Sequence, residues 1–306
     1  MKYEQIYEVD SEFIKDGNIF WETAGSIEYI TATYAGKRYF IKRNISFLYP
    51  SRAGLPEAIY NTYKEEEDYI SARQKQVRYL TKKFDFDRDH IVCELNNFWD
   101  SEKMYVTVTR LVLNPLPRNF DYSSLSLVEF IKLAKDAALL LKKIHESGVI
   151  HGNIRNTNFV IRKEEDSYIP YLTDFEDAYP MDEIPDYDHI GGSEGYESPE
   201  LILYKLGEDM PSDEITTATD IFSLGVVFHR WWTKSFPSID LEHGSVGAAI
   251  CLNKKVTIDD KFDVRIGEHY GVTLKELINW MLVKDPLNRP TAEQVVDVLS
   301  DKRGIK

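Results

Sequence analysis

The segment Val149–Ile161, "VIHGNIRNTNFVI", lies between a helical run and an apolar, strand-like triplet. It contains one histidine, one arginine and three asparagines, but no carboxylate. Polar residues in a loop that is held by rigid elements are often catalytic or ligand-binding residues. The segment therefore predicts a functional loop, and its lack of a carboxylate raises the question of what chemistry it can support.

The chain before this loop is rich in strand patterns. Alternating residues over 18–42 predict two strands joined by a turn at Ala35-Gly36-Lys37. A loop over 44–56 and a long charged helix over 57–83, which has no Gly or Pro, are expected to follow. Two more strand-like runs, over 90–99 and 103–113, complete this part.

The chain from residue 121 onward is mainly helical. Apolar residues at i, i+3 and i+4 spacing predict a helix over 124–147, which Gly148 ends. A hairpin is expected over 158–174, and the stretch "NPLPRNF" (114–120) marks a hinge. We therefore expect one domain over 1–306 with an α+β fold in two lobes, 1–113 and 114–306.

Composition limits the partners and the compartment. A net charge of -14 argues against binding to nucleic acid or to an anionic membrane and favours a basic protein partner. Two distant cysteines indicate a reducing compartment. No apolar run approaches the ~20 residues that span a bilayer, and the N-terminus lacks the apolar core of a signal peptide. The sequence thus predicts a cytoplasmic protein.

Six short motifs occur in a fixed order. They are "YFIK" ending at Lys42, "IHGNIRNTN" ending at Asn158, "TDFED" containing Asp174, "ESPE" ending at Glu200, "DIFSLGVV" beginning at Asp220 and "KDPLNRPT" containing Arg289. Together they make the chain resemble the eukaryotic-type protein kinases over nearly its whole length. The resemblance implies a small β-rich N-lobe with one long helix and a larger, mainly helical C-lobe.

The resemblance also implies a site for ATP and Mg²⁺. Lys42 matches the lysine that neutralises the α- and β-phosphates, while Asn158 and Asp174 match the two metal ligands. Gly25 is the one retained glycine of the phosphate-binding loop, when that loop is matched to "TAGSIEYI". Glu176 replaces the glycine of the DFG motif, which reads DFE here, and is a further candidate ligand for Mg²⁺.

Other positions depart from the family pattern. The HRD motif reads His151-Gly152-Asn153, so that Asn153 replaces the aspartate base, and an amide is not a useful base near neutral pH. Arg155 stands where the family has a lysine that holds the γ-phosphate. Phe40 replaces an alanine that packs against adenine, and its ring would block that space. Gln76 aligns with the glutamate that pairs with the strand lysine.

Five retained motif residues have structural roles in the family. His151 is expected to pack against Phe175, Asp220 to anchor the backbone of residues 151–153, and Glu200 to form a buried ion pair with Arg289. Gly152 replaces the arginine that binds a phosphorylated activation segment, so we expect no switch of that kind.

Three functions are compatible with this pattern. The combined departures favour a pseudokinase that acts as a regulatory or scaffolding partner. A divergent active kinase, which transfers phosphate from ATP to protein Ser/Thr or another acceptor, is the alternative, and nucleotidyl transfer is a weaker one.

The segment Asp174–Glu200 has ten acidic residues and no Lys or Arg, so it is either a solvated loop or a surface for a basic partner. The predicted 44–56 loop and the long helix after it form a second candidate docking surface.

Overall fold

The computed structural model describes residues 22–24, 27–48, 56–99, 104–207, 211–266 and 272–300. The chain divides into two compact units, of which one comprises Met1–Phe86 with Val92–Leu113 and the other comprises Asp87–Ile91 with Asn114–Lys306. The first is based on a β-sheet and the second is mainly helical, as an α+β fold requires. Within the described residues, no helix has the length and apolar character needed to cross a bilayer.

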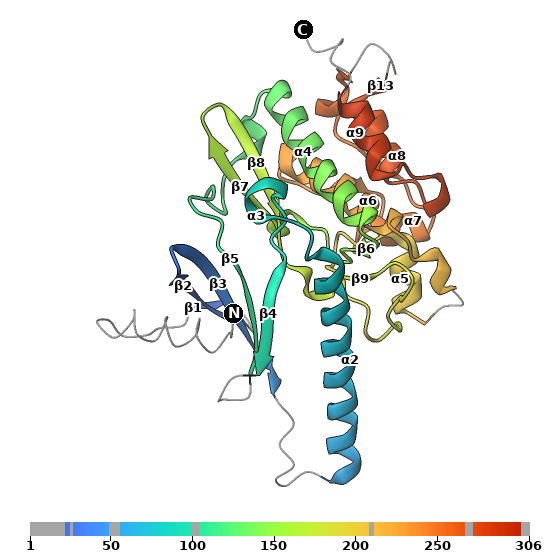
Figure 1. Ribbon diagram of the computed structural model, residues 1–306. Coiled ribbons are helices and arrows are strands. Elements are labelled where there is room, and N and C mark those ends of the chain that lie inside the picture. The colour runs from blue at the N-terminus through green and yellow to red at the C-terminus, as the bar shows by residue number, and fades with distance from the viewer. Residues whose placement is uncertain are drawn as a thin grey trace. The chain divides into compact units, whose positions relative to one another are not determined.

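The first unit contains an antiparallel sheet with a long helix (Figure 1). Its elements are β1 (Glu22–Ala24), β2 (Ile27–Tyr34), β3 (Lys37–Leu48), α2 (Glu57–Thr81), β4 (Glu94–Trp99) and β5 (Met104–Arg110). The strands lie in the order β1-β2-β3-β5-β4 across the part of the sheet that the structure describes. The expected long helix is present and ends at Thr81, two residues before its predicted end.

The turn between β2 and β3 occurs at the predicted position. Ala35 and Gly36 both have positive φ angles, 48° and 72°, and Tyr34 pairs with Lys37. Two residues with positive φ give a turn whose twist matches that of the strands it joins. The predicted loop over 44–56 is wrong at its beginning, because β3 continues to Leu48 through a bulge in its pairing with β5.

The two faces of β3 have different surroundings. Tyr39 and Ile41 are buried in a core cluster with Val106 and Val108 of β5. Since successive side chains of a strand point to opposite faces, Phe40 and Lys42 lie together on the face away from that cluster. The register of β3 therefore makes Phe40 a neighbour of the lysine and keeps it out of the core.

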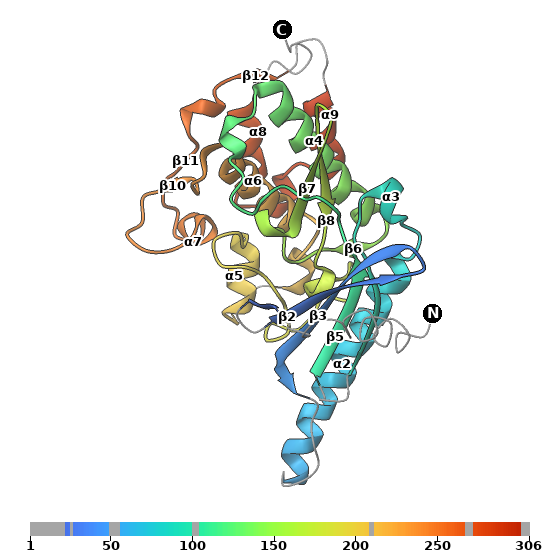
Figure 2. The same ribbon diagram turned by 90° about the vertical axis from the view of Figure 1, so that its left-hand side faces the viewer.

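The second unit is mainly helical (Figure 2). Its longer elements are α4 (Leu127–Glu146), β7 (Phe159–Glu164), β8 (Ser167–Leu172), α5 (Pro199–Lys205), α6 (Ala218–Thr233), α7 (Val246–Cys251), α8 (Leu274–Met281) and α9 (Ala292–Ser300). Short strands are β6 (Val149–Ile150), β9 (Tyr179–Pro180), β10 (Ser238–Ile239), β11 (Val256–Thr257), β12 (Arg265–Ile266) and β13 (Val272–Thr273). Single turns of 3₁₀-helix are η2 (Tyr122–Ser124), η3 (Asn156–Asn158), η4 (Phe175–Asp177), η5 (Ser212–Glu214), η6 (Asp260–Phe262) and η7 (Pro286–Asn288). The four-residue helix α3 (Phe86–Asp89) lies at the division between the units in the sequence.

Helix α4 begins three residues later than the periodicity predicts. Ser126 caps it, because its hydroxyl accepts a bond from the Glu129 backbone N–H while the Glu129 carboxylate accepts one from the Ser126 N–H. Such a capping box satisfies two backbone donors that a helix start leaves unpaired. The helix ends at Glu146, and Gly148, with a φ of 82°, turns the chain toward β6.

Helix α6 is the central helix of the second unit. Nearly all of its residues are buried, including the polar residues Asp220 and His229. A helix that is apolar on almost every side must be surrounded by other elements. Phe130 of α4 stacks on Trp232 with ring centroids 4.7 Å apart, so α4 and α6 pack through large aromatic side chains.

Burial of His229 predicts a loss of stability in acid. Its Nδ1 donates to the Ser235 carbonyl at 2.9 Å and its Nε2 accepts from the Asp259 N–H at 3.3 Å, which is the pattern of a neutral ring. Burial lowers the pKa of His229 below its usual 6.5, against smaller opposing effects of the Ser235 bond and the Asp259 charge. The unfolded chain therefore binds this proton more readily, and stability should fall as the pH drops below 6.5.

Urea unfolding from pH 7.5 to 5.5 should show a shallower decline of the free energy of unfolding in His229→Gln than in the wild type. Equal declines would contradict this role for His229.

Candidate functional site

One buried carboxylate, that of Asp220, binds the backbone of the loop between β6 and η3. Asp220 of α6 accepts hydrogen bonds from the backbone N–H groups of His151, at 2.8 Å, and Gly152, at 3.0 Å. The same carboxylate lies 2.9 Å from His145 Nε2. Asp220 is 1% exposed, so these bonds are made without competition from water. Asp220 therefore sets the backbone of residues 151–153, as the sequence predicts.

Gly152 has a conformation and a location that only glycine fits. Its φ is +73°, and a Cβ atom there would lie 2.7 Å from the carbonyl oxygen of Asp177 and 2.9 Å from the ring of Tyr179. A side chain would meet backbone, which cannot move aside cheaply. The packing of η4 and β9 against Gly152 therefore excludes an arginine at this position.

The His151 ring is fixed by polar and aromatic contacts. Its Nε2 donates to the Thr173 carbonyl at 3.0 Å, while its Nδ1 accepts from the Asn153 N–H at 3.4 Å. The ring is fully buried and lies 4.8 Å from the ring of Phe175, centroid to centroid. Both nitrogens are engaged in holding the loop, so the structure places His151 in the scaffold.

Asn153 is bound on both sides of its amide group. Its Nδ2 donates to Asp177 Oδ2 at 2.7 Å, and its Oδ1 accepts from the Ser193 hydroxyl at 2.7 Å. The side chain is 8% exposed. Two short bonds from opposite directions fix the orientation of this amide, and its NH₂ group faces a carboxylate.

The Asp177 side chain packs directly against Gly191. A Cβ atom on Gly191 would lie 2.4 Å from Asp177 Cγ, so the carboxylate fills the space that a side chain at 191 would need. The Gly191-Gly192-Ser193 stretch therefore packs directly on Asp177 and brings the Ser193 hydroxyl to Asn153. The segment after η4 is folded onto the loop through this contact.

Asp174 occupies a left-handed backbone conformation. Its φ and ψ are 69° and 66°, which is uncommon for a residue other than glycine but is best tolerated by Asp and Asn. The preceding residue, Thr173, donates its N–H to the Asn158 carbonyl at 2.9 Å. The turn thus brings Asp174 beside Asn158 and leads directly into η4, where Glu176 lies half-buried.

Asn158 and Asp174 share a cationic neighbour. Arg155 Nε donates to Asn158 Oδ1 at 3.2 Å, and Arg155 Nη2 lies 4.0 Å from Asp174 Oδ2. The other end of the Asn158 amide donates to the Asn153 carbonyl at 2.8 Å. The two predicted metal ligands are therefore brought together, and a guanidinium group lies against both.

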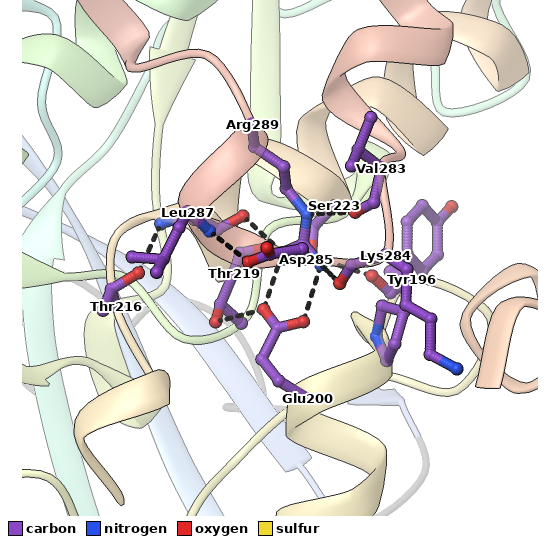
Figure 3. Close-up of polar contacts among 12 residues, drawn as sticks. Tyr196, Glu200, Thr216, Thr219, Ser223, Val283, Lys284, Asp285, Leu287 and Arg289 are labelled. Carbon is purple, nitrogen blue, oxygen red and sulfur yellow. Dashed lines mark hydrogen bonds and ion pairs between the residues drawn. The ribbon is translucent and has the colours of Figure 1, made fainter.

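Glu200 and Arg289 form a buried ion pair (Figure 3). Two bonds of 2.6 Å join the guanidinium to the two carboxylate oxygens, and Thr219 donates to the same carboxylate at 3.0 Å. The remaining Arg289 donors reach backbone carbonyls, which belong to Val283, Ala218 and Lys284. Every donor of the guanidinium is satisfied, which is the condition for a buried charge to be tolerated. The expected ion pair is present and ties α5 to the loop before α9.

A second polar chain reaches the loop from α6. Arg230 donates to the Tyr196 hydroxyl at 2.8 Å, and this hydroxyl donates to Asn156 Oδ1 at 2.5 Å. Burial raises the pKa of Tyr196, so its phenol stays protonated and can donate. These two hydrogen bonds fix Asn156 at the start of η3.

The predicted site residues of the first unit lie on one sheet face or outside the described residues. Phe40 and Lys42 share a face of β3, and the Phe40 ring lies 5.4 Å from the ring of Tyr29, centroid to centroid. Gly25 lies outside the described residues. Gln76, the predicted counterpart of a helix glutamate, is exposed, whereas Gln74 is 2% exposed. Gln74 therefore lies on the buried side of α2 and Gln76 does not.

Sequence reasoning missed the partners that fix Asn153. From the sequence, Asp177 is only one of the ten acidic residues of the segment Asp174–Glu200, and neither Ser193 nor Gly191 is connected with the loop. The Gly191-Gly192 pair before Ser193 is the signal that was available, because adjacent glycines often mark a close approach of two backbones. Such a signal identifies the approach but not the residue approached.

Comparisons with known proteins agree with this architecture. The family described as "Protein kinase domain" matches residues 61–298. A probable serine/threonine-protein kinase of Dictyostelium discoideum is 23% identical over 180 residues, which are 58% of this chain and 10% of that protein. Serine/threonine-protein kinase PKZ1 of Phytophthora infestans is 25% identical over 190 residues, which are 57% of this chain and 45% of the relative. Calcium-dependent protein kinase 21 of Arabidopsis thaliana is 28% identical over 160 residues, 50% of this chain and 26% of the relative. The chain thus spans less than half the length of these curated relatives.

Proposed function

The chain belongs to the protein kinase family, and from that premise we propose that it is a pseudokinase, a regulatory or scaffolding protein with little or no phosphoryl transfer. The proposal rests on the chemical type of Asn153 and on the two hydrogen bonds of its side chain. The residue at the position of the catalytic base is an amide, and its two ends are bound to Asp177 and Ser193. An amide cannot take a proton from a substrate hydroxyl near neutral pH.

Features of the first unit support the same proposal. Within the described side chains of α2, Gln74 is buried, whereas Glu57 and Glu65 are exposed. Phe40 places an aromatic ring on the face of β3 that also carries Lys42. Losing one electrostatic contributor commonly lowers a rate ~10²–10³-fold, and several are changed here.

An active kinase is the alternative, and one observation favours it. The Asp177 carboxylate lies 2.7 Å from the Asn153 amide, so a carboxylate is present beside the position of the usual base. Phosphoryl transfer depends mainly on positioning and charge neutralisation and less on a base. In this alternative, Asp177 takes the proton and Asn153 orients the acceptor.

The proposed function predicts that the protein does not transfer phosphate from ATP. Incubation with labelled ATP, Mg²⁺ and basic peptide substrates should yield no product above the level given by Asp174→Ala. Active protein kinases turn over at about 1–100 s⁻¹, so we expect a rate at least ~10³-fold lower, because several contributors of ~10²–10³ each are changed. The measurement is product formation against time at saturating ATP.

Two variants separate the outcomes of that assay. Transfer that is abolished by Lys42→Ala would contradict the pseudokinase proposal. If the same activity is also lost in Asp177→Asn, then Asp177 serves as the base. An active protein kinase assayed in parallel shows that the peptides and ATP are competent.

We propose a basic protein surface as the partner. Within the described residues, the segment from Asp182 to Glu194 exposes acidic side chains and has no Lys or Arg to neutralise them. Charge complementarity of this kind selects partners and speeds their association. We place the role in the cytoplasm because the cysteine usage indicates a reducing compartment.

A further inference from the structure

The oxygens that would hold a metal ion in the second unit are engaged by an arginine. Arg155 Nε donates to Asn158 Oδ1 at 3.2 Å, and the Thr157 hydroxyl lies 3.5 Å from the same oxygen. Arg155 Nη2 is 4.0 Å from Asp174 Oδ2. One guanidinium group therefore contacts both residues that the family uses as metal ligands.

The arginine is held in this place by its own turn. The Asn158 N–H donates to the Arg155 carbonyl at 3.0 Å, which closes the turn η3. The turn fixes Arg155 three residues before Asn158, so that the side chain can fold back over the amide. Arg155 is 39% exposed and Asp174 is 25% exposed, so the pair is at the surface of the unit and not deep in its core.

The charges of the neighbouring segment explain why a cation is needed there. Asp174, Glu176 and Asp177 lie within four consecutive residues, and the segment Asp174–Glu200 has no Lys or Arg. Carboxylates close together repel each other unless a positive charge lies among them. Arg155 supplies a positive charge beside Asp174.

This arrangement does not fit a divalent cation. Mg²⁺ binds oxygen ligands at about 2.0–2.1 Å and requires them in near-octahedral geometry. Asn158 Oδ1 is instead used as a hydrogen-bond acceptor by the guanidinium, and a second cation placed between Asn158 and Asp174 would be repelled by the first.

We propose that the guanidinium of Arg155 takes the place of the divalent metal between Asn158 and Asp174, so that this site excludes Mg²⁺ and Mn²⁺. The proposal rests on the proposed function, in which the site has kept its architecture and lost its chemistry. An arginine cannot lose its charge at any physiological pH, so the repulsion of a second cation does not depend on pH.

Binding of Mn²⁺ to the protein without nucleotide tests this proposal. Electron paramagnetic resonance measures the concentration of free Mn²⁺ during a titration, and the measurement does not depend on enzymatic activity. The wild type should bind Mn²⁺ weakly at this site, whereas Arg155→Gln should bind it at least about tenfold more tightly, because the competing charge is gone. Arg155→Lys keeps the charge and should behave like the wild type. The gain in Arg155→Gln should disappear in Arg155→Gln/Asp174→Asn.

One other group of side chains needs a control. Ligand atoms of Asp186, Asp188 and His189 lie within 4.8 Å of one another, so this group is a second place where added Mn²⁺ could bind. All titrations are therefore made in an Asp186→Asn/Asp188→Asn background. Circular dichroism and urea unfolding of each variant show that the fold is retained.

Each result decides the proposal. Wild-type binding as tight as that of Arg155→Gln, lost in Asp174→Asn, would overturn it, because the metal would then coexist with the arginine. Failure of Arg155→Gln to gain Mn²⁺ binding would also overturn it, because Arg155 would then not be what excludes the metal. Neither result depends on phosphate transfer, so the labelled-ATP assay can fail or succeed independently.

Discussion

Asn153→Asp should destabilise the protein, although it restores the residue type of an active kinase. The Asn153 amide donates to Asp177 at 2.7 Å, and the substitution would place two carboxylates in that contact. A hydrogen bond to a charged group contributes about 1.5–3 kcal/mol, and repulsion replaces it here. We therefore expect a loss of about 2–3 kcal/mol in the free energy of unfolding at pH 7. The measurement is urea unfolding followed by circular dichroism.

The pH dependence of this variant has a defined sign. Two adjacent carboxylates raise the pKa of one of them, so the folded variant binds a proton more readily than the unfolded chain. Stability relative to the wild type should therefore recover as the pH falls toward 5. A deficit that stays constant from pH 7 to 5 would show that the substitution acts through packing and not through charge.

The exchange of the two residues is the control for Asn153→Asp. In Asn153→Asp/Asp177→Asn an amide again faces a carboxylate, with the positions reversed, and the Ser193 hydroxyl can still donate to residue 153. The double variant should regain most of the lost stability, which double-mutant analysis reports as a favourable coupling. Additive losses would contradict the direct pairing of the two residues.

Removing one member of the Glu200–Arg289 pair should cause the largest loss of stability. The Arg289 side chain is 0% exposed and Glu200 is 2% exposed, and two bonds of 2.6 Å join them. Breaking a buried pair leaves an uncompensated charge, which costs about 3–5 kcal/mol. Arg289→Ala also leaves the carbonyls of Val283, Ala218 and Lys284 without their donor. Thermal and urea unfolding of Arg289→Ala and Glu200→Ala measure this loss.

The Asp260–Lys275 pair provides a matched control at the surface. Its ion-pair distance is 2.5 Å, comparable to that of the buried pair, but the Asp260 side chain is 93% exposed. Water and salt screen exposed ion pairs, so Lys275→Ala should leave the free energy of unfolding close to that of the wild type. A loss from Arg289→Ala as small as this would show that the buried pair does not hold α5 to the chain before α9.

Local sequence patterns predicted much of the fold because the forces that produce these elements act over a few residues. The turn at Ala35-Gly36 needs two residues with positive φ, and the helix Leu127–Glu146 needs an apolar stripe of helical period. Both features are readable in short windows. The error in β3, which runs to Leu48, arose because pairing with β5 extends a strand beyond its own propensity.

The loop Val149–Ile161 combines both kinds of information. By itself, the sequence determined that Asn153 stands where a base is expected and that Asn158 and Asp174 keep the metal-ligand positions. Only the tertiary structure decided what these residues contact. Asn153 is bonded to residues 24 and 40 positions away in the chain, and Arg155 folds back on Asn158. Contacts across such separations depend on how the whole unit packs, because the backbone path that brings Asp177 and Ser193 to the loop is set by Gly191, Gly152 and the buried Asp220 together.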